Sequence, residues 1–119
     1  MSETVLIVDD EKDFLDIMTE RMRARGIRVL ATTSVEDALK MVEEYACDVV
    51  IMDFMMPGID GFKALKLLKA QRPGIQIILL SGNVSGLLAV RAKTLGVLEI
   101  FEKPVDIEVL MRKIKNAGS

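Results

Sequence analysis

The sequence predicts an α/β fold of the (βα)5 type, in which five parallel strands form a doubly wound sheet. Short apolar runs alternate with amphipathic stretches five times along the 119 residues. Continuous apolar runs are typical of strands that are buried on both faces of a parallel sheet. Strict alternation indicates helices on both faces, and right-handed crossovers leave few strand orders. We expect the flavodoxin-like order 2-1-3-4-5, which places the first and third strands side by side.

Strands are expected over residues 4–8, 28–32, 48–52, 76–80 and 98–101. The first apolar run leads directly into Asp9 and Asp10, and the third leads directly into Asp53. Ligands of an open α/β sheet bind beyond the carboxyl ends of its strands. These three carboxylates therefore mark the edge of the sheet where a site is expected.

Helices are expected over residues 12–25, 35–45, 60–71, 85–95 and 106–117. Gly26 suits the position just after the first helix, and Thr33 with Glu36 has the spacing of a capping box before the second. The apolar residues that recur at helical spacing in the first helix are Phe14, Ile17, Met18 and Met22.

The later helices carry similar signals. Asp60 is the expected N-cap of the third helix, and Pro73 with Gly74 ends it. Gly96 is expected to close the fourth helix. The apolar stripe of the third helix is Phe62, Leu65 and Leu68, and that of the last helix is Val109, Leu110 and Ile114.

The composition indicates one globular domain over residues 1–119, with half of its residues hydrophobic and no linker or repeat. The formal net charge of −2 gives no electrostatic case for nucleic-acid binding by this domain. No apolar stretch reaches the length of a membrane span, and an early strand at Val5 leaves no room for a signal peptide. We therefore expect a cytoplasmic protein. Cys47 is the only cysteine, which excludes an internal disulfide, and we expect it to be buried.

The chain contains no histidine. This excludes Ser-His-Asp and Cys-His catalysis and any histidine-based metal site. It also means that this chain cannot carry a phosphohistidine. Any phosphoryl group that arrives through histidine must come from another molecule.

The predicted strand order brings Asp9, Asp10 and Asp53 to one spot. Two like charges about 4 Å apart repel by roughly 4 kcal/mol at an effective dielectric near 20, so such a cluster needs a cation. Hard oxygen ligands in an open cleft suit Mg²⁺. Ser81 follows the fourth apolar run, and Lys103 follows the fifth. In this set Asp53 can attack phosphorus to form an aspartyl phosphate, while the lysine and the hydroxyl bind phosphoryl oxygens.

The sequence resembles the receiver domain of two-component response regulators over essentially its whole length. The motifs that carry the resemblance are Val8-Asp9-Asp10, Asp53 with Pro57 and Gly61, Ser81-Gly82, and Lys103-Pro104. The resemblance implies a signalling switch, which accepts a phosphoryl group from the phosphohistidine of a sensor kinase or phosphotransfer protein in the presence of Mg²⁺. Such a domain catalyses only its own phosphorylation and slow dephosphorylation, so it is not a turnover enzyme.

The resemblance also implies a role for individual residues. Asp53 corresponds to the phosphoacceptor, and Ser81 and Lys103 to the phosphoryl-binding hydroxyl and lysine. Asp9, Asp10, Asp53 and the backbone carbonyl of Met55 correspond to the metal ligands. Phosphorylation is expected to change the surface formed by the fourth helix (85–95), the fifth strand (98–101) and the fifth helix (106–117). This surface selects an output domain or effector. Many receivers dimerise through this surface, so a homodimer is a further expectation. Glu11 and Glu102 are interpreted as peripheral charges.

Two features depart from the family. Receivers usually carry an aromatic switch residue three positions before the lysine, where this chain has Ile100. Phe101 cannot replace it, because neighbouring strand residues point to opposite faces. Met55 and Asn83 occupy the positions that tune loss of the phosphoryl group. Met55 cannot hydrogen-bond an attacking water, so our hypothesis is that it shields the phosphoryl group and lengthens its lifetime.

Three alternatives to a working receiver are open. A Mg²⁺-dependent phosphatase or phosphotransferase with an aspartyl nucleophile usually has a second carboxylate soon after the nucleophile, where this chain has Met55. A flavin-binding module would need a phosphate loop after the first strand, where Asp9 and Asp10 repel phosphate. A degenerate receiver would bind its partners constitutively, and Ile100 leaves room for that function.

Overall fold

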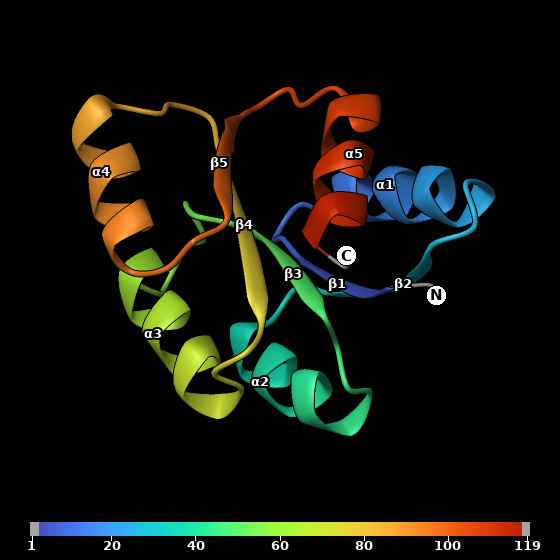
Figure 1. The fold of residues 1–119 in the computed structure, drawn as a ribbon, viewed down its shortest axis with the longest axis horizontal. Coiled ribbons are helices and arrows are strands. Elements are labelled where there is room, and N and C mark those ends of the chain that lie inside the picture. The colour runs from blue at the N-terminus through green and yellow to red at the C-terminus, as the bar shows by residue number, and fades with distance from the viewer. Residues whose placement is uncertain (1–2, 118–119) are drawn as a thin grey trace.

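The computed structural model describes residues 3–117 as five strands alternating with five helices (Figure 1). The two ends of the expected domain, residues 1–2 and 118–119, lie outside the described residues. The strands are β1 (Thr4–Val8), β2 (Arg28–Thr32), β3 (Val49–Asp53), β4 (Gln76–Ser81) and β5 (Glu99–Glu102). The helices are α1 (Lys12–Ala24), α2 (Val35–Glu44), α3 (Gly61–Gln71), α4 (Gly86–Thr94) and α5 (Ile107–Ala117).

All strand pairs are parallel, and the order β2-β1-β3-β4-β5 confirms the predicted topology. β1 and β3 are neighbours, with Val8 opposite Met52 in the register. On the other side of β3, Asp53 pairs with Leu80, the residue before Ser81. The register therefore brings the carboxyl ends of β1, β3 and β4 to the same edge of the sheet.

The sheet divides the core into two separate apolar clusters. Helices α1 and α5 cover one face, and α2, α3 and α4 cover the other (Figure 1). The strand residues alternate between the clusters, so Leu6 and Val8 belong to one and Val5 and Ile7 to the other. This alternation explains why the central strands are apolar at every position.

The helix ends confirm several expectations and correct one. Asp60 caps α3 by accepting a hydrogen bond from the Phe62 N–H at 2.9 Å. Gly26 and Gly96 follow α1 and α4 with φ angles of 83° and 88°, a left-handed conformation that glycine adopts without steric cost. The predicted capping box is wrong, because Ser34 rather than Thr33 caps α2. Its hydroxyl accepts from the Asp37 N–H at 3.1 Å.

The apolar faces of two helices also differ from the prediction. In α1 the side chain of Ile17 is 49% exposed, whereas Leu15, Met18 and Met22 are buried. In α5 Val109 is exposed, and the buried residues are Leu110, Met111 and Ile114. Cys47 is buried, as expected, and burial raises the pKa of its thiol. None of the helices within residues 3–117 has the length and apolar character that crossing a bilayer requires.

Candidate functional site

Three carboxylates meet where β1 and β3 end. Asp9, Asp10 and Asp53 each offer one oxygen, and these three oxygens lie within 4.8 Å of one another. Asp9 is fully buried and accepts the Glu11 N–H at 2.8 Å, while Asp53 is 7% exposed and accepts the Met55 N–H at 3.0 Å. Closely spaced carboxylate oxygens suit a hard divalent cation such as Mg²⁺. The expected convergence of the three residues is therefore confirmed.

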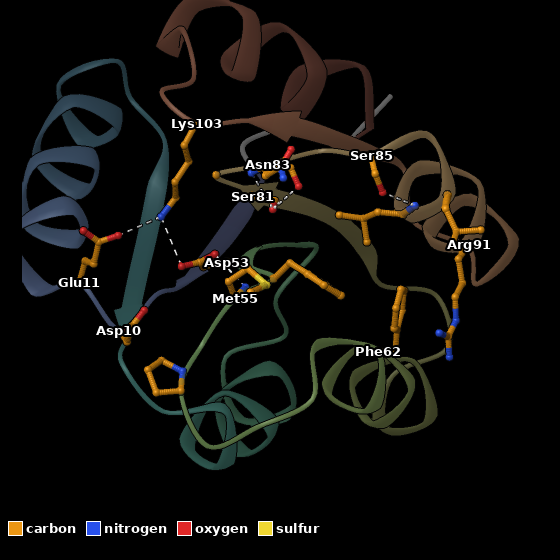
Figure 2. Close-up of a pocket in the computed structure, with 15 residues that line it drawn as sticks. Asp10, Glu11, Asp53, Met55, Phe62, Ser81, Asn83, Ser85, Arg91 and Lys103 are labelled. Carbon is orange, nitrogen blue, oxygen red and sulfur yellow. Dashed lines mark hydrogen bonds and ion pairs between the residues drawn. The ribbon is translucent and has the colours of Figure 1, made fainter.

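Lys103 brings a positive charge into this cluster from the segment after β5 (Figure 2). Its ammonium lies 2.8 Å from Asp9 Oδ2 and 3.4 Å from both Asp53 Oδ2 and Glu11 Oε1. It also lies 4.5 Å from the centre of the Phe14 ring. The peptide bond between Lys103 and Pro104 is cis. The lysine thus links the ends of β1, β3 and β5.

Burial and charge pairing act against each other on the ionisation of Asp9 and Lys103. Burial raises the pKa of Asp9, and the hydrogen bonds from Lys103 and from the Glu11 N–H only partly offset this effect. Partial burial would lower the pKa of Lys103, but Asp9, Asp53 and Glu11 outweigh burial and raise it. The ammonium therefore stays charged beside Asp53.

Ser81 ends β4 and begins the loop that leads to α4. The residue is buried, and its hydroxyl forms two hydrogen bonds with the backbone of Asn83. The hydroxyl accepts from the Asn83 N–H at 3.3 Å and donates to the Asn83 carbonyl at 3.1 Å. The Lys103 N–H donates to the Ser81 carbonyl at 2.8 Å. Ser81 and Lys103 are therefore joined through the backbone at the same edge of the sheet.

A cavity of about 850 Å³ opens over this edge and is lined by most of the predicted site residues. One end is polar, and the residues there are Asp10, Glu11, Asp53, Ser81, Asn83 and Lys103. The other end includes Phe62 of α3 and Arg91 of α4, and most of the remaining lining residues are apolar. Met55 lies between the two ends, with 66% of its surface exposed (Figure 2).

An aromatic stack forms the far wall of the cavity. The rings of Phe54 and Phe62 meet edge to face, with their centres 4.8 Å apart. The guanidinium of Arg91, from α4, lies 3.9 Å from the centre of the Phe62 ring. Gly61 permits this arrangement, because a Cβ there would lie 2.5 Å from the Phe54 ring and 2.6 Å from its carbonyl oxygen. The stack therefore connects the residue after Asp53 to α4.

Ile100 and Phe101 point to opposite faces of β5, as predicted. Ile100 packs with the cluster beneath α2, α3 and α4, whereas Phe101 packs with the cluster beneath α1 and α5. Phe101 therefore does not occupy the side of the sheet that holds Ile100.

Sequence reasoning missed the contacts of Glu11, Glu102 and Arg91. Glu11 is an ion-pair partner of Lys103, and Glu102 accepts a hydrogen bond from the Val84 N–H at 3.1 Å. Both side chains are exposed, which agrees with their interpretation as peripheral charges, but that interpretation did not include these contacts. The signal for Glu11 was its place directly after the acidic pair. No local pattern marked Arg91, because its partner lies on another helix.

Comparison with known proteins agrees with this geometry. The profile of the response regulator receiver domain matches residues 5–115. The response regulator SaeR of Staphylococcus aureus is 32% identical over 112 residues, which are 94% of this chain and 49% of SaeR. The chain thus spans about half the length of the curated relatives that it matches.

Solved structures give the same result. A response regulator receiver domain protein from Clostridium thermocellum is 31% identical, with a TM-score of 0.89 over 97% of this chain and 93% of that one. The BeF3-activated receiver domain of DrrB is 27% identical, with a TM-score of 0.85 over 98% of this chain and 97% of that one. The profile match covers nearly all of the described residues. The chain therefore belongs to the response regulator receiver domains, the signalling modules of two-component systems.

Proposed function

We propose that this chain is a phosphorylation-dependent switch and that Asp53 is its phosphoacceptor. The observation that carries the proposal is the position of the Lys103 ammonium, 3.4 Å from Asp53 Oδ2 within a cavity that also contains Ser81. The carboxylate is open to the cavity, whereas Asp9 behind it is fully buried. Asp53 is thus the member of the pair that an incoming phosphoryl group can reach.

The proposed donor is the phosphohistidine of a sensor kinase or phosphotransfer protein. An oxygen of Asp53 forms a bond to phosphorus as the bond from phosphorus to the imidazole nitrogen breaks, and the imidazole leaves with that electron pair. Lys103 neutralises charge on the phosphoryl oxygens. The Ser81 hydroxyl donates to one of these oxygens after it leaves the Asn83 carbonyl. Positioning and charge stabilisation therefore provide most of the catalysis.

The donor set fits a magnesium ion. Asp9, Asp10, Asp53 and the backbone carbonyl of Met55 are the proposed ligands, and the clustered carboxylate oxygens support this assignment. Mg²⁺ bound there supplies positive charge against the transferring phosphoryl group. Lys103 and Ser81 remain the side chains that contact the phosphoryl oxygens.

The proposed output surface is formed by α4, β5 and α5. Phosphorylation would change it through the β4–α4 loop, because Ser81 begins that loop and α4 follows it. Exposed apolar residues on α4, Leu87 and Val90, support a role in contact with an effector, an output domain or a second copy of the chain. Activation of the DrrB receiver domain by BeF3 supports the same type of switch.

The first test is intact mass after incubation with acetyl phosphate and Mg²⁺. We expect the wild type to gain one phosphoryl group, and we expect no gain without Mg²⁺ or in the Asp53→Ala variant. Equal labelling of Asp53→Ala would contradict the assignment of the acceptor.

A folded wild type without a mass gain would next be mixed with phosphorylated candidate kinases. Transfer from one of them would support a receiver that depends on its kinase. Failure with all of them would favour the alternative, a degenerate receiver that binds partners constitutively.

A further inference from the structure

The loop between β4 and α4 is attached to the end of β5 by one side chain. Glu102 is the last residue of β5, directly before Lys103, and it stands opposite Ser81 in the sheet register. Its carboxylate accepts the Val84 N–H at 3.1 Å. A hydrogen bond to a charged acceptor is stronger than one between neutral groups. Glu102 therefore fixes the middle of the loop that Ser81 begins.

A second attachment lies at the start of the same loop. The Ser81 hydroxyl accepts the Asn83 N–H and donates its proton to the Asn83 carbonyl. In this arrangement the hydroxyl proton is used in the bond to the Asn83 carbonyl. A hydroxyl has one proton to donate, so Ser81 must give up the Asn83 carbonyl before it can bind a phosphoryl oxygen. The Glu102 bond is made to Val84, the residue that follows Asn83.

We propose that Glu102 is a positioning residue that stabilises the resting conformation of the β4–α4 loop. This inference rests on the proposed function and adds a regulatory element to it. An interaction made only in the resting state shifts the equilibrium towards that state and lowers the apparent affinity for anything that needs the other state. Glu102 would thus set how readily Ser81 turns towards a phosphoryl group on Asp53.

Other charges on β5 do not have this arrangement. Glu99, on the same strand, lies 3.4 Å from Lys93 of α4 and 3.4 Å from Lys113 of α5. Its contacts join the two helices that flank β5, whereas the contact of Glu102 is with the loop. The two acidic residues of β5 therefore act on different parts of the switch.

The test compares the binding of beryllofluoride with Mg²⁺ to the wild type, Glu102→Ala and Glu102→Gln. Glu102→Ala removes the acceptor, and its affinity should rise about three- to tenfold, the range expected for one hydrogen bond. Glu102→Gln retains a neutral oxygen acceptor, so its affinity should rise less. Glu44→Ala removes an exposed carboxylate at the end of α2 and controls for the change in net charge.

A second measurement does not depend on phosphorylation. Exchange of the Val84 amide hydrogen, followed by NMR in the unphosphorylated protein, should be faster in Glu102→Ala than in the wild type and Glu44→Ala. The free energy of unfolding should change little, because Glu102 is exposed. A Val84 amide that exchanges at the wild-type rate in Glu102→Ala would overturn the proposal.

The two measurements separate this inference from the proposed function. Suppose that the wild type binds beryllofluoride and that Glu102→Ala binds it within twofold of the wild-type affinity. The role of Glu102 would then be refuted, and the switch would stand. A wild type that binds no beryllofluoride would contradict the switch itself and would overturn the regulatory role with it.

Discussion

Replacement of Lys103 by methionine tests the electrostatics of the site. The lysine side chain is 17% exposed and lies between Asp9 and Asp53, whose side chains are 1% and 7% exposed. The substitution keeps much of the aliphatic stem and removes the charge. Two nearly buried carboxylates would then face each other without the ammonium. We therefore expect a large loss of stability in metal-free buffer at pH 7.

The size of the loss follows from the distances. At an effective dielectric near 20, two carboxylate oxygens at the 4.8 Å limit of this cluster repel by about 3.5 kcal/mol. Removing one partner of a buried ion pair costs about 3–5 kcal/mol in measured cases. Asp53 faces the cavity, which allows some solvation, so we expect the lower end of that range. The free energy of unfolding should fall by about 3 kcal/mol.

Urea unfolding followed by circular dichroism measures this loss. Lys66→Met, which removes an exposed charge from α3, is the matched control and should lose well under about 1 kcal/mol. Adding Asp9→Asn to Lys103→Met should restore part of the stability, because it removes one of the two facing charges. Equal stability of the Lys103→Met and Lys66→Met proteins would refute the reasoning.

Two further predictions concern residues around this centre. Met55→Asn should shorten the lifetime of the phosphoryl group, because asparagine can hold an attacking water at the rim of the cavity. The decay of the phosphorylated protein, measured by intact mass, checks this prediction. An unchanged half-life would reject the hypothesis that Met55 shields the phosphoryl group. Partial burial opposes the ionisation of Glu99, but the Ile100 N–H, Lys113 and Lys93 outweigh it and lower its pKa. Its stabilising effect is therefore complete above the unfolded pKa of about 4.3 and is lost as pH falls through the folded value. In urea unfolding, Glu99→Gln should lower the free energy of unfolding by about 0.5 kcal/mol at pH 7 and by little at low pH. A difference in stability between the two proteins that does not depend on pH would contradict this account.

Much of the fold and the centre of the site could be predicted from the sequence because each strand ends abruptly. Apolar runs that change to Asp9 and Asp53 identify both a buried strand and the edge where it stops. Parallel topology then requires these ends to converge. Lys103 follows the same logic after β5. These inferences need only the strand order, which right-handed crossovers restrict.

The remaining features depend on three-dimensional details that local patterns do not contain. Phe14, Leu15, Ile17 and Met18 are all apolar, so spacing alone allows more than one buried face for α1, and packing on the sheet selects Leu15 and Met18. The hydrogen bond of Glu102 depends on the path of a loop 18 residues earlier in the chain.

The division of the core by the sheet has a consequence for how this chain tolerates change. Leu65 and Val42 pack on one side, while Leu15 and Ile114 pack on the other, and the two groups belong to separate clusters. Substitutions at distant sites without shared partners usually have additive effects on stability. Mutations on opposite sides of this sheet should therefore add rather than compensate each other. Core residues beneath α2, α3 and α4 can then change during evolution without compensating substitutions beneath α1 and α5. One side of the domain can therefore diversify while the other is retained.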